Sequence, residues 1–253
     1  MTSQHLTIIT GASRGMGLAM AELRLDAGHR LLCISRQANA ALASRASPSA
    51  NTAEQWTQDL SQTQEAAARL GAWLGELNGD EFASVTLINN AGVLPQIAPL
   101  GDIASADLAL ALRVDLEAPM LLTGAFLRAT GGWRAARKVL NISSGLGRRA
   151  MASQAAYCGA KAGMDLFSNC VALEEANKPN GARICSLAPG VIDTDMQVQL
   201  RGADSNSFPD IGNFVGLKDK GMLSSPHDAA AKVLAYLDRA DFGAKPIADV
   251  RDV

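Results

Sequence analysis

The feature that most constrains the fold is a series of short apolar runs separated by longer stretches with helical character. Each run spans only four to six residues, and most are nearly continuous in apolar character, which is typical of strands that helices cover on both faces. We expect strands at Leu6–Thr10, Arg30–Ser35, Glu54–Thr57, Ser84–Asn89, Lys138–Ser143 and Arg183–Leu187, and a first helix at Met16–Ala27. Strands that alternate with helices indicate βαβ units and therefore a parallel sheet.

Length and rhythm together predict one α/β domain over residues 1–253, a Rossmann-type doubly wound parallel sheet with helices on both faces. Gln37–Thr52 is rich in Ala and Ser and reads as a short helix or a loop. Gly202–Gly221 breaks the rhythm with four glycines and one proline. Because it follows the sixth strand, we expect a lid segment at about residues 195–222, over a site at the carboxyl ends of the strands. The alternative is a surface excursion without function.

Composition excludes several classes of function. The chain has 23 Lys+Arg against 25 Asp+Glu and no long basic stretch, so we expect neither a nucleic-acid partner nor a membrane partner. No apolar run approaches the roughly 20 residues that cross a bilayer, and Met1–His5 does not resemble the start of a secretory leader. The four cysteines are scattered, which argues against a zinc site or a disulfide framework. We therefore expect a cytoplasmic protein without a metal.

A glycine-rich turn joins the first strand to the first helix. The segment Thr10–Gly17 has the spacing G-x-x-x-G-x-G. Glycines at such a turn let the backbone approach a pyrophosphate, which then lies on the positive end of the helix. The flanking strand and helix strengthen this interpretation, because an isolated glycine turn is a weak signal.

Four further motifs follow in order along the chain. They are Asn89-Asn90-Ala91-Gly92, Asn141-Ile142-Ser143-Ser144, Tyr157-Cys158-Gly159-Ala160-Lys161 and Pro189-Gly190. With the glycine turn, this set resembles the short-chain dehydrogenase/reductase family over essentially the whole chain. The second half is most similar to sepiapterin reductase and benzil reductase-like bacterial members, in the stretches YCGAKAGMDLFSNCVALEE, LAPGVIDTDMQ, LKDKGML and IADVRDV. The resemblance implies a carbonyl reductase that acts on a ketone or a dicarbonyl.

Tyr157 and Lys161 are four residues apart, so both lie on one face of a helix. A tyrosine is a poor acid at neutral pH, and we expect the Lys161 cation to lower the pKa of Tyr157 so that it can protonate the reduced carbonyl oxygen. Ser144, thirteen residues before Tyr157, matches the serine that polarises the substrate oxygen in the family. By itself the Tyr/Lys pair would be interpreted as an ordinary surface pair. Together with the glycine turn and Ser144, a catalytic role for the pair is favoured.

The second strand ends at Ser35-Arg36 without a carboxylate for a ribose 2′-hydroxyl, and Arg14 lies in the glycine turn. Arginine binds phosphate in a bidentate fashion, so these residues favour a site for the 2′-phosphate of NADP(H). The alternative is that both arginines are surface residues that contact only solvent. The resemblance extends the expected cofactor contacts to Gly11, Ser13, Arg14, Gly15, Met16, Gly17, Ser35, Arg36, Asp59, Leu60, Asn90, Ala91, Gly92, Tyr157, Lys161, Pro189, Gly190, Ile192, Thr194 and Met196.

Two acidic residues carry further expectations from the resemblance. Asp115 stands where family members usually have an asparagine that takes part in a proton relay to the lysine. Its charge would favour the charged form of Lys161, and we expect activity with an altered pH dependence. Asp249 aligns with the aspartate that anchors the pterin in sepiapterin reductase, and we expect Ser144, Tyr157 and Asp249 to contact substrate; a solvated charge in a polar C-terminal segment is the alternative for Asp249.

Two other functions compete with an NADPH-dependent carbonyl reductase. One is a broad-substrate or 3-oxoacyl reductase, although Ala244–Val253 lacks the Asp-Gly-Gly ending usual in 3-oxoacyl reductases. The other is a regulator that binds NADP(H) without turnover, which the intact Ser144, Tyr157 and Lys161 disfavour. The resemblance also implies a homodimer or homotetramer built on Ala106–Leu127 and Ala155–Ala176. The apolar faces expected there are Val114, Leu121, Leu122, Met164, Phe167 and Val171.

Overall fold

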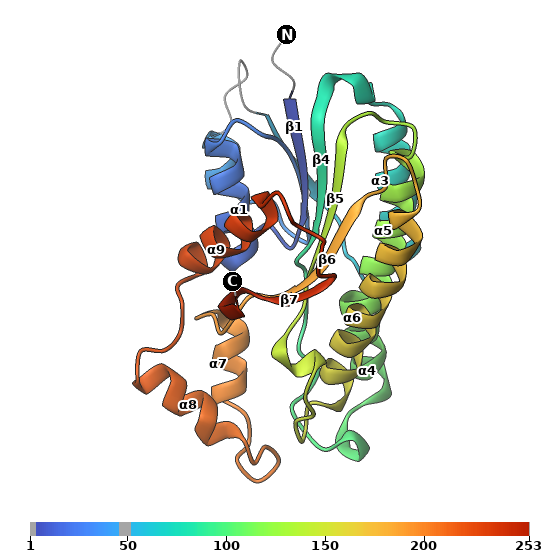
Figure 1. Ribbon diagram of the computed structural model, residues 1–253. Coiled ribbons are helices and arrows are strands. Elements are labelled where there is room, and N and C mark those ends of the chain that lie inside the picture. Colours follow the sequence, from blue (N-terminus) through green and yellow to red (C-terminus); the bar gives the residue numbers. More distant parts are fainter. Residues whose placement is uncertain (1–3, 46–51, 253) are drawn as a thin grey trace.

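A seven-stranded parallel sheet forms the centre of the protein, whose computed structural model describes residues 4–45 and 52–252 (Figure 1). The strand order is β3-β2-β1-β4-β5-β6-β7. The strands are β1 Gln4–Thr10, β2 Arg30–Ser35, β3 Ala53–Thr57, β4 Phe82–Asn89, β5 Ala136–Ile142, β6 Arg183–Ala188 and β7 Ile247–Asp249. The first six agree with the expected runs to within two residues at each end, and the α/β Rossmann-type fold is confirmed.

Helices cover both faces of the sheet (Figure 1). In chain order they are α1 Gly15–Asp26, α2 Ala40–Arg45, α3 Thr63–Gly75, α4 Ser105–Leu112, α5 Ala118–Ala129, α6 Ala155–Ala176, α7 Asp195–Arg201, α8 Ile211–Asp219 and α9 Pro226–Asp238, with a π-helical turn at Arg113–Glu117 and short 3-10 turns at Gly79–Glu81, Leu100–Asp102, Gly145–Gly147 and Val250–Asp252. Helices α1 and α9 pack on one face, and α3, α5 and α6 pack on the other. The interiors of β1, β2, β4, β5 and β6 are almost fully buried, as near-continuous apolar runs require, whereas the edge strand β3 buries only Trp56.

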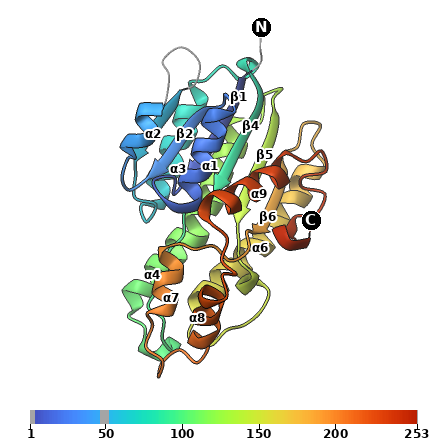
Figure 2. The ribbon, with the colours of Figure 1, turned by 90° about the vertical axis from the view of Figure 1, so that its left-hand side faces the viewer.

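The order of the strands creates the site. The chain builds outward from β1 through β2 to β3, and then crosses back so that β4 pairs with the other side of β1. The first helices therefore diverge from the ends of β1 and β4 and leave a crevice at the carboxyl ends of the strands. Helices α7 and α8 lie beyond these ends (Figures 1 and 2).

Two segments contain more structure than their sequence indicates. The C-terminal segment forms a seventh strand, β7, in which Ala248 pairs with Leu187 of β6. The segment expected as a lid contains α7 and α8, which bury Leu200, Phe208 and Phe214 together. In Gln37–Thr52, α2 gives the expected short helix, whereas residues 46–51 lie outside the described part.

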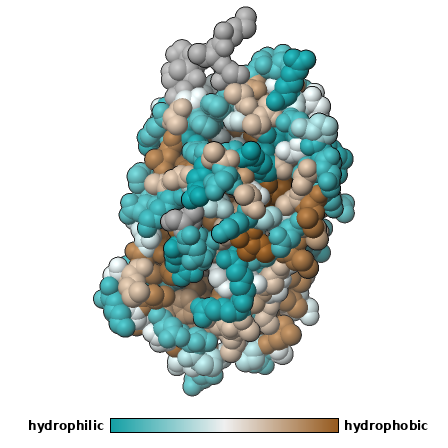
Figure 3. All heavy atoms as spheres, in the orientation of Figure 1, coloured by the Kyte–Doolittle hydropathy of each residue, from teal (hydrophilic) through white to brown (hydrophobic). Residues whose placement is uncertain are grey.

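The prediction of which apolar residues lie at a subunit interface needs correction. Val114, Leu122, Met164 and Val171 are buried within the protomer itself, because α5 and α6 turn those faces toward the sheet and the cavity. The large apolar side chains that α4, α5 and α6 expose, among the described residues, include Leu110, Leu112, Met120, Leu166 and Leu173. Apolar side chains gather along the edge formed by α4 and α6 (Figure 3).

Within residues 4–45 and 52–252, no helix is long and apolar enough to cross a membrane. The same residues contain no cluster of three or more His, Cys, Asp or Glu side chains that could hold a metal ion.

Candidate active site

A cavity of about 1390 Å³ lies at the carboxyl ends of the strands, between the sheet and α7 and α8. Every residue expected to contact the cofactor lies on its wall, as does Ser144. Asp115 and Asp249 do not line it. The fold thus brings together motifs that are up to 185 residues apart, counted from Gly11 to Met196.

The glycine turn lies on the cavity wall and has no room for a side chain at Gly11 or Gly17. Gly11 and Gly15 adopt φ angles of +68° and +57°, a region that glycine reaches without strain. A Cβ atom on Gly17 would lie 2.2 Å from the carbonyl oxygen of Gly11. The Asn90 side chain fixes the turn from β4, because its amide donates to the carbonyl of Thr10 at 2.9 Å. Backbone this bare at the start of α1 fits a dinucleotide pyrophosphate.

Ser35 and Arg36 follow β2 on the cavity wall, and no carboxylate accompanies them at the strand end. Arg36 is exposed and makes no hydrogen bond or ion pair with the described residues. Arg14 differs from expectation, because its guanidinium is ion-paired with Asp195 at the start of α7. Both side chains of this pair are exposed, so the pair links the glycine turn to α7 at the surface of the cavity.

Ser144, Tyr157 and Lys161 also lie on the wall of this cavity. Tyr157 and Lys161 lie on consecutive turns of α6, and the Lys161 Nζ is 5.6 Å from the centroid of the tyrosine ring. Lys161 donates to the carbonyl of Ile142 at 3.0 Å, which ties α6 to the end of β5. The Tyr157 hydroxyl lies 4.0 Å from the sulfur of Met196 on α7. A cation, a phenol and an alcohol thus share one wall.

The structure also distinguishes Ser144 from its neighbour. Ser144 accepts a hydrogen bond from the backbone N–H of Leu146 at 3.1 Å and remains on the cavity wall. The hydroxyl of Ser143 instead donates to the buried Asp165 at 2.7 Å. Ser143 is therefore committed to the interior, and Ser144 is the serine whose hydroxyl can reach a substrate.

The pKa of Tyr157 is not lowered as expected. Burial raises it well above its usual range, and the charge of Asp115 raises it further, whereas the hydrogen bond with Ser144 acts in the opposite direction. Lys161 is not among the groups that set it. Tyr157 is therefore protonated at neutral pH, which is the form that a proton donor needs, although the raised pKa also makes that proton harder to release.

The model of the family "short chain dehydrogenase" matches residues 5–205, about four fifths of the chain. The chain is a short-chain dehydrogenase/reductase. A benzil reductase ((S)-benzoin forming) of Bacillus cereus is 34% identical over 235 residues, which cover 93% of this chain and 94% of that protein. A sepiapterin reductase of Xenopus tropicalis is 31% identical over 245 residues, covering 92% and 91%. The solved KRED1-Pglu enzyme superposes with a TM-score of 0.80 at 25% identity and covers 97% of this chain and 100% of its own.

Membership makes this protein an oxidoreductase that acts on a CH–OH or C=O group with a nicotinamide cofactor, NAD(P)(H). The substrate is accordingly a small carbonyl compound or the corresponding alcohol.

Asp115 of this reductase lies in the π-helical turn Arg113–Glu117 between α4 and α5 and is fully buried. Its Oδ1 accepts a hydrogen bond from the N–H of Val93 at 2.8 Å, whereas its Oδ2 has no partner in the described part of the chain. A Cβ on Gly92 would lie 3.5 Å from Asp115 Oδ1 and 3.9 Å from Lys161 Nζ, so these two groups flank Gly92. Burial raises the pKa of Asp115, while Lys161 and the Val93 N–H lower it.

Asp249 ends β7, and its carboxylate does not reach the cavity wall. It accepts from Nε of Arg251 at 2.8 Å, from Nη2 at 2.6 Å and from the N–H of Arg251 at 3.0 Å. The Asp249 side chain is only 7% exposed, whereas that of Arg251 is 64% exposed. The reductase therefore presents Arg251, not Asp249, to the cavity.

Several wall residues of the reductase were not expected from its sequence. They include Arg149 and Arg251, together with Asn213, Phe214 and Leu217 of α8. The expected lid indicated the region that holds the α8 residues, but glycine spacing does not show which helix face turns inward. For Arg251 the only signal was its position two residues after Asp249.

Proposed function

We propose that this enzyme is an NADPH-dependent carbonyl reductase that reduces one carbonyl of a vicinal dicarbonyl, such as an aromatic α-diketone. The observation that carries the proposal is the convergence of Ser144, Tyr157 and Lys161 on the cavity that the glycine turn also borders. The similarity to benzil reductase, which extends over 93% of the chain, supports the diketone.

Each of the three side chains has a distinct role. When bound, the nicotinamide cofactor supplies the hydride. Ser144 donates a hydrogen bond to the substrate carbonyl oxygen and stabilises the negative charge that develops there. Tyr157 transfers its phenolic proton to that oxygen. Lys161 does not lower the pKa of Tyr157 in the free protein, but its Nζ lies 5.6 Å from the centroid of the tyrosine ring, and we propose that its positive charge stabilises the phenolate that this transfer leaves behind once the cofactor is bound.

Two features support NADPH as the cofactor. The end of β2 offers Ser35 and Arg36 instead of a carboxylate. Arg36 has no partner among the described residues, and a guanidinium suits a 2′-phosphate. Arg14 is also within the turn, and we propose that it leaves Asp195 for the phosphate when the cofactor binds. An ion pair this exposed is worth little, so the exchange is not costly.

The state of Asp249 favours a diketone over a pterin. An anchor for an amino-pyrimidinone needs free carboxylate oxygens, and Arg251 engages both oxygens of Asp249. We therefore place the pterin second, with sepiapterin as its probe.

The test measures NADPH consumption with benzil, sepiapterin and an acetoacetyl thioester, with NADH as the cofactor control. We expect benzil to be reduced fastest and NADPH to be used in preference to NADH. Turnover of the thioester alone would assign a 3-oxoacyl reductase. Tight NADPH binding without turnover of any substrate would favour the regulator and overturn the proposal.

We further propose that the enzyme is a homodimer or homotetramer whose interface includes α6. Leu166 and Leu173 are 66% and 72% exposed, and their spacing of seven residues places them on one face of that helix. Met120 of α5 is also exposed.

A further inference from the structure

The cavity wall carries an excess of positive charge. Its cations are Arg14, Arg36, Arg149, Lys161 and Arg251, against the carboxylates of Asp59, Asp193 and Asp195, and Asp195 is paired with Arg14. Asp193 is already neutralised, because Lys218 lies 2.6 Å from its Oδ2 and Arg201 lies 3.8 Å from its Oδ1. Lys161 is committed to Tyr157 and Ile142. Arg149 and Arg251 are therefore cations that the reaction does not use.

Arg251 is held in place and keeps donors free. The buried Asp249 engages its Nε and one hydrogen of its Nη2, so three of the five guanidinium N–H groups remain available. A Cβ on Gly145 would lie 3.9 Å from the Arg251 Nη2. Because Gly145 directly follows Ser144, this guanidinium lies over the turn that begins at the catalytic serine.

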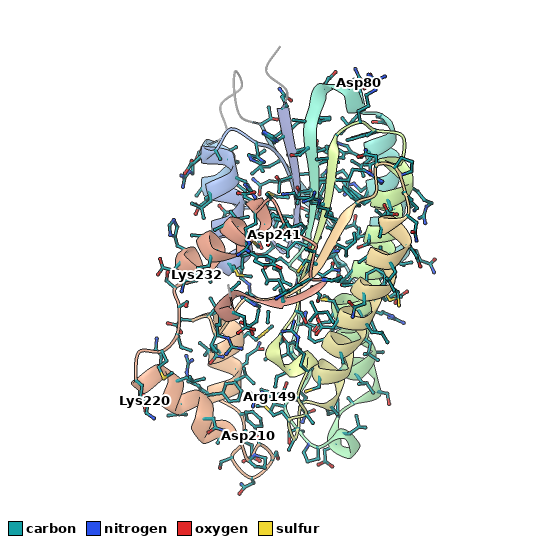
Figure 4. The ribbon with its side chains drawn as sticks, in the orientation of Figure 1. Asp80, Arg149, Asp210, Lys220, Lys232 and Asp241 are labelled. Carbon is teal, nitrogen blue, oxygen red and sulfur yellow. The ribbon has the colours of Figure 1, made fainter. Side chains whose placement is uncertain are left out.

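Arg149 stands at the other end of the same turn and has no hydrogen-bond or ion-pair partner among residues 4–45 and 52–252. The neighbouring Arg148 anchors the turn: its Nε donates to Asp165 at 3.1 Å, and its Nη2 donates to the carbonyl of Ala248 in β7 at 2.9 Å. The turn that carries Arg149 is thereby tied to the strand that leads into Arg251. Arg149 lies in the gap between α8 and the body that contains α4 and α6 (Figure 4).

We infer that the substrate is a carbonyl compound that also carries a carboxylate, which Arg149 and Arg251 bind while Ser144 and Tyr157 engage the carbonyl. The inference rests on the proposed reductase function and narrows its substrate class. Guanidiniums on a cavity wall bind a carboxylate through charge-assisted hydrogen bonds; Asp249 acts as a positioning residue for Arg251, whereas Arg149 is exposed and is free to turn toward the ligand. A neutral aryl group would leave these donors without a charged partner.

The test compares benzil-4-carboxylate with its methyl ester, which has nearly the same size and the same diketone but no charge. The quantity measured is the ratio of kcat/KM for the acid to kcat/KM for the ester, and the ester serves as the internal reference for each variant. We expect a ratio above one that falls about tenfold when Arg149→Ala and Arg251→Gln are combined, because the substrate loses its charge-assisted bonds. The ratio should also fall as salt is added.

Three single variants serve as controls for folding, for charge and for effects outside the cavity. Arg149→Ala removes no contact within the described chain, so its effect does not depend on refolding of β7. Arg251→Lys keeps the charge and should retain part of the preference. Lys232→Ala removes an exposed cation of α9 outside the cavity and should leave both rates unchanged (Figure 4).

Calorimetric titration of both ligands into the protein, with and without NADP+, separates this inference from the function on which it rests. Reduction of the ester with an acid-to-ester ratio that the arginine variants leave unchanged would overturn the inference and keep the reductase. Tighter, arginine-dependent binding of the acid without turnover would keep the anion site and overturn the reductase. Equal binding of acid and ester by all variants would also overturn the inference.

Discussion

Asp115 shows how one carboxyl oxygen can alter the chemistry of a site. Its Oδ1 accepts a hydrogen bond from the Val93 N–H as an asparagine oxygen could, but its Oδ2 is buried without a partner in the part of the chain that the structure describes. Ionised Asp115 also raises the pKa of Tyr157. An amide at this position would keep the acceptor and remove the charge.

Replacing Asp115 by Asn should therefore move the alkaline limb of the pH–rate profile for carbonyl reduction to lower pH. The sign follows from the charge: ionised Asp115 raises the pKa of Tyr157, so its removal lowers that pKa, and Tyr157 loses its proton at lower pH. The measurement is kcat/KM against pH for both proteins. An unmoved limb would contradict the coupling.

The same residue should affect stability in a pH-dependent way. Because the pKa of Asp115 is higher in the folded state than in the unfolded state, protonated Asp115 stabilises the fold. This stabilisation is fully present below the pKa of the unfolded state and is lost as the pH rises through the pKa of the folded state. Asp115→Asn should therefore raise the Tm at neutral pH and lose this advantage in acid. Asp115→Ala leaves the Val93 N–H without its acceptor and should cost about 1–3 kcal/mol instead. Thermal unfolding at two pH values checks both expectations.

Arg36 should decide between the two nicotinamide cofactors. Arg36→Ala removes a charged phosphate ligand, and we expect KM for NADPH to rise about tenfold while KM for NADH changes little. Steady-state kinetics with both cofactors measures the difference. A parallel loss with NADH would assign Arg36 to a role other than recognition of the 2′-phosphate.

At the scale of elements, buried Asp165 holds the catalytic helix α6 against the sheet. Its Oδ1 accepts from Ser143 at the end of β5 and from Ser186 of β6 at 2.6 Å, while Oδ2 accepts from Arg148. Because Asp165 lies one turn beyond Lys161, these bonds fix the face of α6 that presents Tyr157 and Lys161. The glycine turn lies on the wall of the same cavity, and its glycines leave room for a ligand because they carry no side chains.

Gly17→Ala should disrupt that wall. The added Cβ would meet the Gly11 carbonyl oxygen at 2.2 Å, and this oxygen belongs to backbone that cannot simply rotate away. We expect a loss of about 1–3 kcal/mol in the free energy of unfolding, together with weaker NADPH binding. Urea unfolding and a fluorescence titration with NADPH measure the two effects.

Gly216→Ala is the matched control for this substitution. Gly216 lies in α8 with no atom within 4 Å of an added Cβ, so alanine should stabilise the helix by about 0.5–1 kcal/mol. If both alanine variants lost stability equally, the crowding at Gly17 would not be the cause.

At the scale of the whole molecule, we expect the exposed leucines of α6 to lie in the interface of the proposed homodimer or homotetramer. A double variant, Leu166→Glu and Leu173→Glu, should convert the oligomer to monomers, since buried carboxylates would lose hydration. Light scattering after size exclusion gives the mass. Met222→Glu places the same charge on an exposed apolar position beyond α8 and should leave the mass unchanged. A wild-type monomer would overturn the proposal.

The sequence by itself indicated the first six strands, the glycine turn and the Ser144, Tyr157 and Lys161 set, because these depend on local periodicity and on fixed spacings. Features that depend on contacts between residues distant in sequence could be seen only in the tertiary structure. Strand β7 is three residues long and carries too little pattern to stand out; it exists because β6 offers an edge with which it can pair. Likewise, Val114 and Met164 are apolar in any reading, and only packing shows that they face inward. The pKa of Tyr157 rises because burial and Asp115 act on it in space, and Arg251 reaches the cavity because Asp249 holds it there.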